Sequence, residues 1–563
     1  MRRYMFATAM LFLCGAEPTA LAAAPPARAS SVEVQILAIN DFHGNLDSPA
    51  NPTTITLTDG SKLEQRVGGA SALLATINRL RSGHRQTITV SAGDLIGASP
   101  LVSAYFLDEP TIQAMNELGL ELNAVGNHEF DKGRNELLRM QRGGCAKYTS
   151  REPCRVEPFK GARFSFLAAN VLDSTGSTIF PATAIRQFGP VKIGFIGMTL
   201  TETRTLVTPA GVAGLTFEDE AKSANALVPR LKAAGADAIV LLIHQGGRTP
   251  QTFRESGCPD FTGPILDVMD RLDPAISVIV SGHTHQAYAC RIKRGGTDRL
   301  LTSAGRYGNL VTDIRLEFDR STRALTARSA HNVPVRPELG QDASINALVQ
   351  RYAAAAAPAA ARAVGKLSGP ALKSETDEEG TAGDLIADAQ LAATWPRDRG
   401  AADISFINAP GIRTSLIPQA DGTVTYGKIF AVQPFGNNLV VKPLTGAQLK
   451  AALEQQFIEE AGRGQLGSLL IPSGNFRFTY DMSLPRGQRI TAMTLDRKPV
   501  DAARRYRVTV NNFLSSGGDG FSVFADVSEA FDAGLDLDAL EAYLARTPSV
   551  APDRVTKVTA GSR

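Results

Sequence analysis

The sequence has few of the residues that mark several common protein classes. Its 563 residues include 1 tryptophan and 6% aromatic residues, and the formal net charge is +3 without any long basic run. Binding to a nucleic-acid polymer is therefore not expected as the main role, because such proteins usually carry a basic face with aromatic residues beside it. Beyond the N-terminus no apolar stretch is long enough for a bilayer, so we expect no membrane span in the mature chain.

The N-terminus has the pattern of an export signal. Arg2 and Arg3 form a basic start, residues 5–16 an apolar core, and residues 20–22 or 27–29 a small-residue cleavage site. A membrane anchor is the alternative, but the apolar run is short and is followed by proline and charge. We therefore expect residues 1–29 to be a signal peptide and the protein to be exported to the periplasm.

Cysteine is also scarce, with 5 residues in the chain. Cys14 could serve as a lipid attachment site, although Leu13 stands before it where a small residue is expected. The other four are Cys145, Cys154, Cys258 and Cys290. An even number in an exported protein favours disulfides, and none has the spacing of a zinc-thiolate site. Three connectivities are possible, and proximity in sequence favours Cys145–Cys154 and Cys258–Cys290.

Histidine is scarce too, yet its 7 residues are not scattered. Five of them lie in short polar motifs after apolar runs, and only His84 and His331 lie elsewhere. The motifs are Asn40-Asp41-Phe42-His43-Gly44-Asn45, Ser91-Ala92-Gly93-Asp94, Gly126-Asn127-His128-Glu129-Phe130-Asp131, Ile243-His244 and Ser281-Gly282-His283-Thr284-His285. Solvated surface histidines would not gather in this way, so we interpret the motifs as parts of one site.

The apolar runs before these motifs are typical of buried strands. We predict strands at residues 32–39, 87–91, 122–125, 164–169, 191–197, 238–243 and 276–280. Stretches with helical spacing, such as residues 67–81 and 218–234, separate several of them. Strands that alternate with helices predict an α/β sheet, in which ligands bind beyond the carboxyl ends of the strands. All five motifs lie at that edge.

The second half of the chain is expected to form another domain, because 563 residues exceed what one core usually organises. An alanine-rich stretch from Ala343 to Lys366, interrupted by Pro358, predicts a helix or semi-rigid connector. After it we predict a helix at residues 381–394 and strands at residues 404–407 and 507–511.

The motif side chains suit divalent metal ions. Aspartate, histidine and asparagine side chains of the motifs provide seven candidate ligands. Their oxygen and nitrogen donors suit zinc, manganese, iron or cobalt better than calcium or copper(I). Seven donors are too many for one tetrahedral ion, but they fit two ions that share a carboxylate, an arrangement suited to phosphoryl hydrolysis.

The five motifs resemble those of calcineurin-like metallophosphoesterases. Their order and spacing, with the second half of the chain, resemble the bacterial periplasmic 5′-nucleotidase and UDP-sugar hydrolase family from about residue 32 to about residue 550. The resemblance implies an α/β protein with a four-layer αββα metallophosphoesterase domain at residues 30–338. A connector helix or hinge would follow at residues 339–366, and a C-terminal α/β nucleotide-binding domain at residues 367–555.

The resemblance also implies roles for the motif residues. One metal ion would be held by Asp41, His43, Asp94 and His285, and the other by Asn127, His244 and His283, with Asp94 as the bridge. His128 and Asp131 resemble the catalytic dyad of the family. The best-known periplasmic members carry glutamine where this chain has His285, which leaves the metal preference open. Two divalent ions, zinc, manganese or cobalt, are the expected cofactors.

In the second half, the resemblance implies a nucleotide pocket. Phe435 and Phe513 would stack on the base, and Arg413 would bind phosphate. Asn437 would contact the base edge and Asp519 the ribose hydroxyls, with Gly474 close by. Known members carry two further phosphate-binding arginines upstream of residues 381–394, where this chain has a single lysine among acidic residues at 372–379. Fewer cations favour nucleoside monophosphates.

The sequence thus predicts an exported two-metal phosphohydrolase that acts on nucleoside 5′-monophosphates. Hydrolysis of UDP-sugars is left open as an additional activity. Alternatives with the same chemistry are a 2′,3′-cyclic-nucleotide phosphodiesterase or 3′-nucleotidase and a thiosulfohydrolase of the same superfamily; the paired phenylalanines argue against the last. A surface binding protein without activity is the remote alternative. The expected partner is a nucleotide substrate, and the protein is expected to be a monomer.

Overall fold

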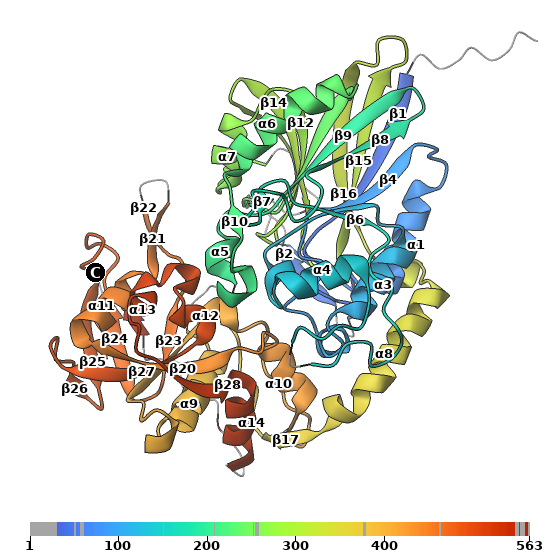
Figure 1. Cartoon of the computed structure of the whole chain (residues 1–563). Helices are drawn as coiled ribbons and strands as arrows, with labels where there is room; N and C mark the ends of the chain where they lie inside the picture. Colours follow the sequence, from blue (N-terminus) through green and yellow to red (C-terminus); the bar gives the residue numbers. More distant parts are fainter. Residues whose placement is uncertain are drawn as a thin grey trace, which may run out of the picture.

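A computed structural model of the protein describes residues 31–560 except 50–51, 57–60, 150, 208, 251–252, 254–257, 375–378, 461–462, 547–550 and 552–557. The predicted signal peptide and Cys14 lie outside the described residues, as does part of the acidic stretch at 372–379. Among the helices of the described part, none has the length and apolarity needed to cross a membrane. Figure 1 shows two domains, the first coloured blue to yellow-green and the second orange to red.

The first domain is built on two six-stranded sheets. One has the order β16-β15-β1-β4-β5-β6 and the other β13-β14-β12-β11-β9-β8. The first comprises β1 (Ser31–Ile39), β4 (Thr87–Ser91), β5 (Leu122–Ala124), β6 (Ser165–Leu167), β15 (Leu310–Asp319) and β16 (Leu325–Pro334). The second comprises β8 (Thr183–Phe188), β9 (Val191–Met198), β11 (Ala238–Ile243), β12 (Ile276–Ser281), β13 (Ala287–Arg294) and β14 (Thr297–Ala304). In each sheet four neighbouring strands run parallel: β1, β4, β5 and β6, and β9, β11, β12 and β14.

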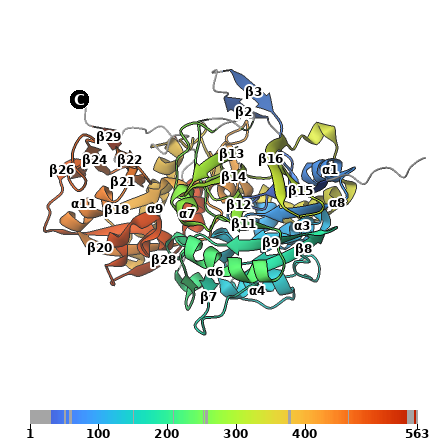
Figure 2. The same ribbon diagram turned by 90° about the horizontal axis from the view of Figure 1, so that it is seen from above.

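The two sheets pack face to face, with helices on the outer faces. Ile36 of β1 joins Val240 of β11 in the core between the sheets, whereas the adjacent Leu37 faces a second core with the outer helices. This alternation follows from the period of a strand, whose successive side chains point to opposite faces. Helices α1 (Ala70–Arg81), α3 (Glu109–Leu118), α4 (Arg134–Arg142) and α8 (Ala343–Ala361) cover one sheet, and α6 (Glu220–Ala233) and α7 (Ile265–Arg271) cover the other (Figure 2). The predicted four-layer αββα fold is therefore confirmed.

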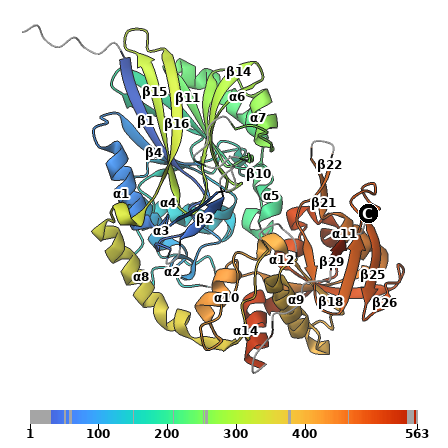
Figure 3. The same ribbon diagram turned by 180° about the vertical axis from the view of Figure 1, so that it is seen from behind.

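Helix α8 links the domains, as Figure 3 shows. It begins where the side chain of Asp342 accepts hydrogen bonds from the main-chain nitrogens of Ser344 and Ile345, and it continues through Pro358. Tyr352 is fully buried in the first domain. The predicted connector extends too far, because the helix ends at Ala361 and residues 363–366 form β17 (Ala363–Lys366), which pairs with β19 (Thr423–Thr425).

The second domain contains a five-stranded sheet of order β23-β18-β27-β20-β28 and a four-stranded sheet of order β26-β25-β24-β29. The strands are β18 (Ile404–Asn408), β20 (Asn438–Thr445), β23 (Leu470–Pro472), β24 (Phe476–Tyr480), β25 (Ile490–Leu495), β26 (Lys498–Pro499), β27 (Arg505–Asn511), β28 (Phe531–Leu535) and β29 (Val558–Ala560). The helices are α9 (Thr381–Thr394), α10 (Tyr426–Val432), α11 (Gly446–Glu454), α12 (Asn512–Ser515), α13 (Ser522–Ala525) and α14 (Asp536–Arg546). Most of the buried apolar side chains of this domain form one core.

Shorter elements complete the fold. They are α2 (Leu101–Ala104), α5 (Thr203–Leu206), β2 (Thr53–Thr56), β3 (Lys62–Gln65), β7 (Val171–Leu172), β10 (Thr216–Phe217), β21 (Phe457–Glu460) and β22 (Arg463–Leu466). A 3-10 turn, η1 (His128–Phe130), follows β5 and carries part of the third motif.

Both expected disulfides are present in the structure. Cys145 and Cys154 lie with their Cα atoms 5.6 Å apart, and Cys258 and Cys290 with theirs 5.7 Å apart. The second bond is the more enclosed, since Cys290 is fully buried in β13 and Cys258 is 9% exposed. It fastens the segment after β11 to the sheet that carries the histidine motifs.

We expect the double substitution Cys258→Ser/Cys290→Ser to lower the denaturant midpoint of the first domain more than Cys145→Ser/Cys154→Ser does. The sequence separations are 32 and 9 residues. Loop-closure entropy assigns about 4 kcal/mol to the longer loop and about 3 kcal/mol to the shorter one. Urea titrations followed by circular dichroism measure the order of the two variants, and the reverse order would contradict the prediction.

Candidate metal and substrate site

The five motifs meet at the carboxyl ends of parallel strands from both sheets. Asp41 and His43 follow β1, Asp94 follows β4, Asn127 follows β5 and His244 follows β11, while the Ser281–His285 motif begins with the last residue of β12. Five of the seven candidate ligands adopt a left-handed backbone: Asp41, His43, Asp94, His283 and His285 have φ angles of 48°, 47°, 52°, 70° and 58°. Non-glycine residues adopt this conformation at a cost, and such residues cluster at functional sites.

The first group of ligand atoms comes from Asp41, His43 and His285. The His43 Nδ1 donates to the carbonyl of Gly97 at 2.9 Å, so its Nε2 carries a lone pair. That Nε2 lies 3.1 Å from the Nε2 of His285. The Nε2 of His285 is in turn 3.4 Å from the Oδ1 of Asp41. Three donor atoms therefore converge on one point.

The second group comes from Asp94, His244 and His283. The His244 Nδ1 donates to the carbonyl of Ala92 at 2.8 Å, which directs its Nε2 toward the other donor atoms. This Nε2 lies 3.0 Å from the Oδ2 of Asp94 and 3.1 Å from the Oδ1 of Asn127. Lone pairs this close repel one another unless a proton or a cation lies among them, so the donor set fits a divalent ion.

Asp94 connects the two groups. Its Oδ2 is 3.0 Å from the Nε2 of His244 and 3.7 Å from the Nε2 of His43. Its Oδ1 accepts a hydrogen bond from the main-chain nitrogen of His128 at 2.9 Å, which fixes the carboxylate. The residues therefore suit two ions that share this carboxylate.

The electrostatics of the site favour positive charge beside Asp94. Burial lowers the pKa of His244, but the adjacent carboxylate of Asp94 outweighs it and raises this pKa to about 10. Burial and the charge of His244 lower the pKa of His283 to about 4. His244 thus attracts a proton while His283 stays neutral. This pattern is expected where a buried carboxylate favours a positive charge beside it.

Glu129 holds the ligand loops together, a role that the sequence analysis missed. Its carboxylate accepts hydrogen bonds from the main-chain nitrogens of Asp94, Leu95 and Gly126 at 2.9, 2.8 and 2.7 Å. It is 2% exposed, and burial together with the charge of Asp94 raises its pKa to about 8. The signal was its place in the third motif, directly after His128.

Asn40 supports the other side of the site and was also missed. Its side-chain nitrogen donates to the Oδ2 of Asp41 and to the carbonyl of Gly305, both at 2.7 Å. Its oxygen accepts from the main-chain nitrogen of Ala304 at 2.7 Å. Gly126 is required by space, because a Cβ there would lie 2.2 Å from the Oδ1 of Asp94.

His128 and Asp131 form a pair beside the ligand groups. The Nδ1 of His128 is 2.8 Å from the Oδ2 of Asp131, and both side chains are 17% exposed. Burial lowers the pKa of His128, but Asp131 and Asp94 outweigh it, so that this pKa lies above its ordinary value. The imidazolium form, with a proton on Nε2, is therefore favoured.

Two residues of the second domain reach this site. The ring of Phe435 stacks on that of His128, with centroids 6.1 Å apart and an interplanar angle of 22°. The guanidinium of Arg413 lies 5.8 Å from the Phe435 ring and 3.5 Å from the hydroxyl of Tyr307 in the first domain. The expected phosphate-binding residue and one of the expected base-stacking rings thus lie next to the metal ligands.

The other residues of the expected nucleotide pocket lie deeper in the second domain. Asp519 accepts from the side chains of Asn408 and Ser468 at 2.8 and 3.0 Å, and burial raises its pKa. The Phe513 ring covers Gly518, where a Cβ would lie 2.5 Å from it. The carbonyl of Asn437 accepts from the main-chain nitrogen of Asp536 at 2.9 Å. In this structure the two phenylalanine rings thus have different neighbours.

Gly474 does not lie beside Asp519. Strand β23 runs antiparallel to β18 and pairs Leu470 with Asn408 and Pro472 with Phe406. Gly474 follows two residues later, and its nitrogen donates to Asp388. It therefore lies at the opposite end of β18, roughly 13 Å along the strand at about 3.3 Å per residue. The expectation that it lies beside the pocket is wrong, because the strand direction carries it away.

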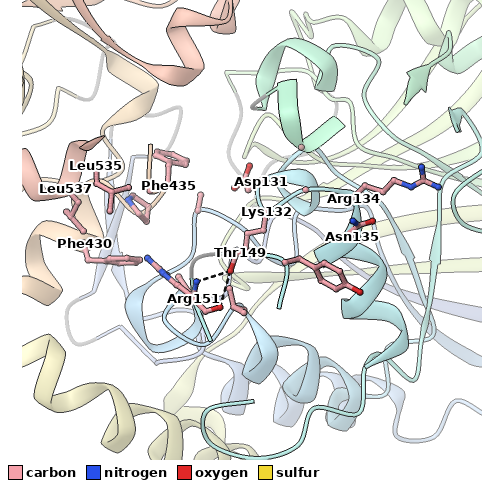
Figure 4. A pocket seen from close by; sticks show the side chains of 18 of the residues that line it. Asp131, Lys132, Arg134, Asn135, Thr149, Arg151, Phe430, Phe435, Leu535 and Leu537 are labelled. Carbon is pink, nitrogen blue, oxygen red and sulfur yellow. Dashed lines mark hydrogen bonds between the residues drawn. The ribbon is translucent and has the colours of Figure 1, made fainter. Parts of the chain in front are cut away.

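A cavity of about 670 Å³ lies between the domains on the outer side of the His128–Asp131 pair. Its walls include Asp131 and Lys132 of the first domain and Phe430 and Phe435 of the second, as Figure 4 shows. Arg151 also lines it, and its guanidinium lies 5.1 Å from the Phe430 ring. The interface between the domains is thus hollow next to the candidate site.

Comparison with known families agrees with this architecture. Residues 34–287 match the calcineurin-like phosphoesterase model, and residues 356–526 match the model of the 5′-nucleotidase C-terminal domain. The chain belongs to the family of calcineurin-like phosphoesterases that carry a C-terminal 5′-nucleotidase domain.

Individual relatives span much of the chain. The chain is 28% identical to an endonuclease of Bacillus subtilis over 86% of its own length, and 29% identical to a cell wall protein of Listeria monocytogenes over 88%. It spans 37% and 65% of the lengths of these two proteins. The crystal structure of a 5′-nucleotidase precursor from Thermus thermophilus matches with a TM-score of 0.74 and 27% identity, covering 94% of this chain and 99% of that one.

We expect Glu129→Gln to weaken metal binding without unfolding the protein. The amide would turn an NH₂ group toward at least one of the main-chain N–H groups that now donate to the carboxylate, and so displace Asp94. Residues that orient metal ligands typically change affinity by about 10- to 100-fold. Zinc and manganese titrations by calorimetry measure this, with the exposed Glu117→Gln as the control. Equal affinity in both variants would contradict the role of Glu129.

Proposed function

We propose that this protein is an exported, metal-dependent phosphohydrolase that releases phosphate from nucleoside 5′-monophosphates. The observation that carries the proposal is the pair of ligand groups that share Asp94 and lie beside the His128–Asp131 pair. Paired ions with a bridging carboxylate suit displacement at phosphorus. The proposal places the protein in the periplasm as a monomer, in line with the export pattern of its first residues.

Two divalent ions, zinc, manganese or cobalt, fit the donor set. Asp41, His43, Asp94 and His285 would hold one, and Asn127, His244 and His283 the other, with Asp94 common to both. Bound there, such ions polarise phosphoryl oxygens and lower the pKa of bound water, which supplies the nucleophile. The Nδ1–carbonyl hydrogen bonds of His43 and His244 orient each ring so that Nε2 is directed at the metal position, where a bound cation would take the place of a proton.

His128 would supply a proton or a hydrogen bond to the developing negative charge. Its Nδ1 is held by Asp131, so the Nε2–H is the group free to act on the phosphoryl or leaving oxygen. The neighbouring carboxylates of Asp131 and Asp94 raise the pKa of His128 and so favour retention of that proton.

The second domain would recognise the nucleotide. Arg413 suits phosphate because its planar guanidinium offers several donors and lies next to the first domain at Tyr307. Phe435 and Phe513 would stack on the base, Asn437 would contact its edge and Asp519 the ribose hydroxyls. The match to the 5′-nucleotidase C-terminal domain and the 5′-nucleotidase of Thermus thermophilus supports this assignment.

A second candidate function is the hydrolysis of phosphodiesters. It is favoured by the similarity to the endonuclease of Bacillus subtilis, which extends over 86% of this chain. The same metal-ligand groups would act in both reactions. The two reactions would differ in whether the phosphorus carries one ester bond or two before hydrolysis. Assays with 2′,3′-cAMP beside AMP separate the two candidates, since a diesterase opens 2′,3′-cAMP to an adenosine monophosphate, whereas a monoesterase leaves it intact and releases phosphate from AMP.

We expect chelated protein to release no phosphate from AMP and to recover activity when Mn²⁺, Zn²⁺ or Co²⁺ is restored. His128→Ala should lower kcat by about 10²- to 10⁴-fold, the usual contribution of a positioned proton donor, while metal content stays unchanged. Phosphate release and metal analysis of the same samples measure both effects. Full activity of the chelated protein, or of the histidine variant, would overturn this mechanism.

The pH dependence gives a separate check on the pair. Asp131 raises the pKa of His128, so activity that needs protonated His128 persists to higher pH in the wild type. We expect Asp131→Asn to shift the alkaline fall of kcat/KM for AMP toward lower pH. An unchanged alkaline limb would show that His128 does not act as the acid.

We expect Phe435→Ala/Phe513→Ala to raise KM for AMP about tenfold or more, since stacking contributes about 1–3 kcal/mol per base. Hydrolysis of p-nitrophenyl phosphate, which has no nucleobase, should change little and serves as the control for an intact metal site. Equal losses of activity on both substrates would mean that the rings stabilise the structure of the site and do not bind the base.

A further inference from the structure

The loop after β14 brings Arg306 and Tyr307 to the edge of the metal groups. The main-chain nitrogen of Tyr307 donates to the carbonyl of Asp41 at 2.7 Å, and its φ angle of 61° is left-handed. Its ring centroid lies 5.8 Å from that of His285 and 6.0 Å from that of His43. The position of Tyr307 is therefore fixed by the backbone of a metal-ligand residue.

Two guanidinium groups from different domains meet at this tyrosine. The Cζ of Arg306 lies 5.0 Å from the Tyr307 ring, and the Nη2 of Arg413 lies 3.5 Å from the Tyr307 hydroxyl. Arg306 is exposed, whereas Tyr307 and Arg413 are half-buried.

Neither arginine forms an ion pair with a carboxylate in the described part of the chain, in contrast to Arg315, which binds Asp313 and Glu33. Two unpaired cations that flank one side chain repel each other, and an anion between them would relieve this repulsion. The chemistry of Arg306 and Arg413 therefore selects a group with several acceptor oxygens.

We propose that Arg306, Tyr307 and Arg413 form a subsite for a second, non-reacting phosphoryl group, which makes Arg306 a specificity-determining residue for nucleoside diphosphates. The proposal rests on the function proposed above. When the terminal phosphoryl group lies at the metal groups and the base lies in the second domain, any additional phosphoryl group lies between them. The Tyr307–Arg413 contact is one place where the two domains meet next to the histidines.

This subsite changes the expected phosphate preference. The single lysine and many acidic residues at 372–379 favoured monophosphates, because Arg413 was the one phosphate-binding arginine expected in the second domain. Arg306 supplies the additional cation from the first domain. It was not recognised in the sequence because it lies outside the five motifs, at the end of a strand that carries no candidate ligand.

The test compares AMP with ADP in metal-loaded wild type, Arg306→Gln, Arg306→Lys and Tyr307→Phe. We expect Arg306→Gln to lower kcat/KM for ADP about tenfold, the loss of one charge-assisted contact, and that for AMP less than twofold. Arg306→Lys should recover part of the ADP activity, and Tyr307→Phe should lower it by a smaller factor. Arg505→Gln is the matched control, an exposed arginine of the second domain 3.8 Å from Glu529.

Equal falls on AMP and ADP, or no fall on either, would overturn the subsite. If wild type hydrolyses neither nucleotide, the proposed function fails, and the subsite is then judged by calorimetric binding of α,β-methylene-ADP and AMP. Selective weakening of the diphosphate analogue in Arg306→Gln would support it. Equal affinities of wild type and variant for the analogue would overturn it.

Discussion

The shared carboxylate of Asp94 is the constraint on which the rest of the site depends. Its Oδ2 faces one histidine of each ligand group, and its Oδ1 is fixed by the main chain of His128. One side chain therefore sets the positions of the two ligand groups and of His128 relative to one another. A shift of this carboxylate would disturb all three at once.

Main-chain hydrogen bonds around Asp94 fix its position. The Glu129 carboxylate accepts hydrogen bonds from three main-chain N–H groups that follow two different strands. Gly126 leaves room for the Asp94 side chain. The left-handed backbone at most of the ligand residues is the cost of this arrangement. The buried sheets behind the loops are rigid enough to sustain it, because the core between them is continuous.

The two domains meet through side chains at several points, and Leu101 and Ala104 of α2 pack in the main core of the second domain. Phe435 stacks on His128, Arg413 touches Tyr307, and α8 joins the domains while packing on the first. Residues that would recognise the nucleotide thus reach the metal groups only across an interface that contains a cavity. Such an interface suits a substrate that must enter between the domains.

The sequence by itself determined the α/β class and the presence of polar motifs after apolar strands, because these are local patterns, whereas the four-layer first domain and the set of candidate ligands followed from the resemblance to a known family. The disulfide pairing also followed from proximity in the chain. Only the tertiary structure decided which ligands share Asp94, that Glu129 binds three N–H groups, that Gly474 lies away from Asp519, and that Arg306 lies beside Tyr307. These relations join residues that are distant in sequence, and strand direction and register, which no local pattern contains, bring them together or keep them apart.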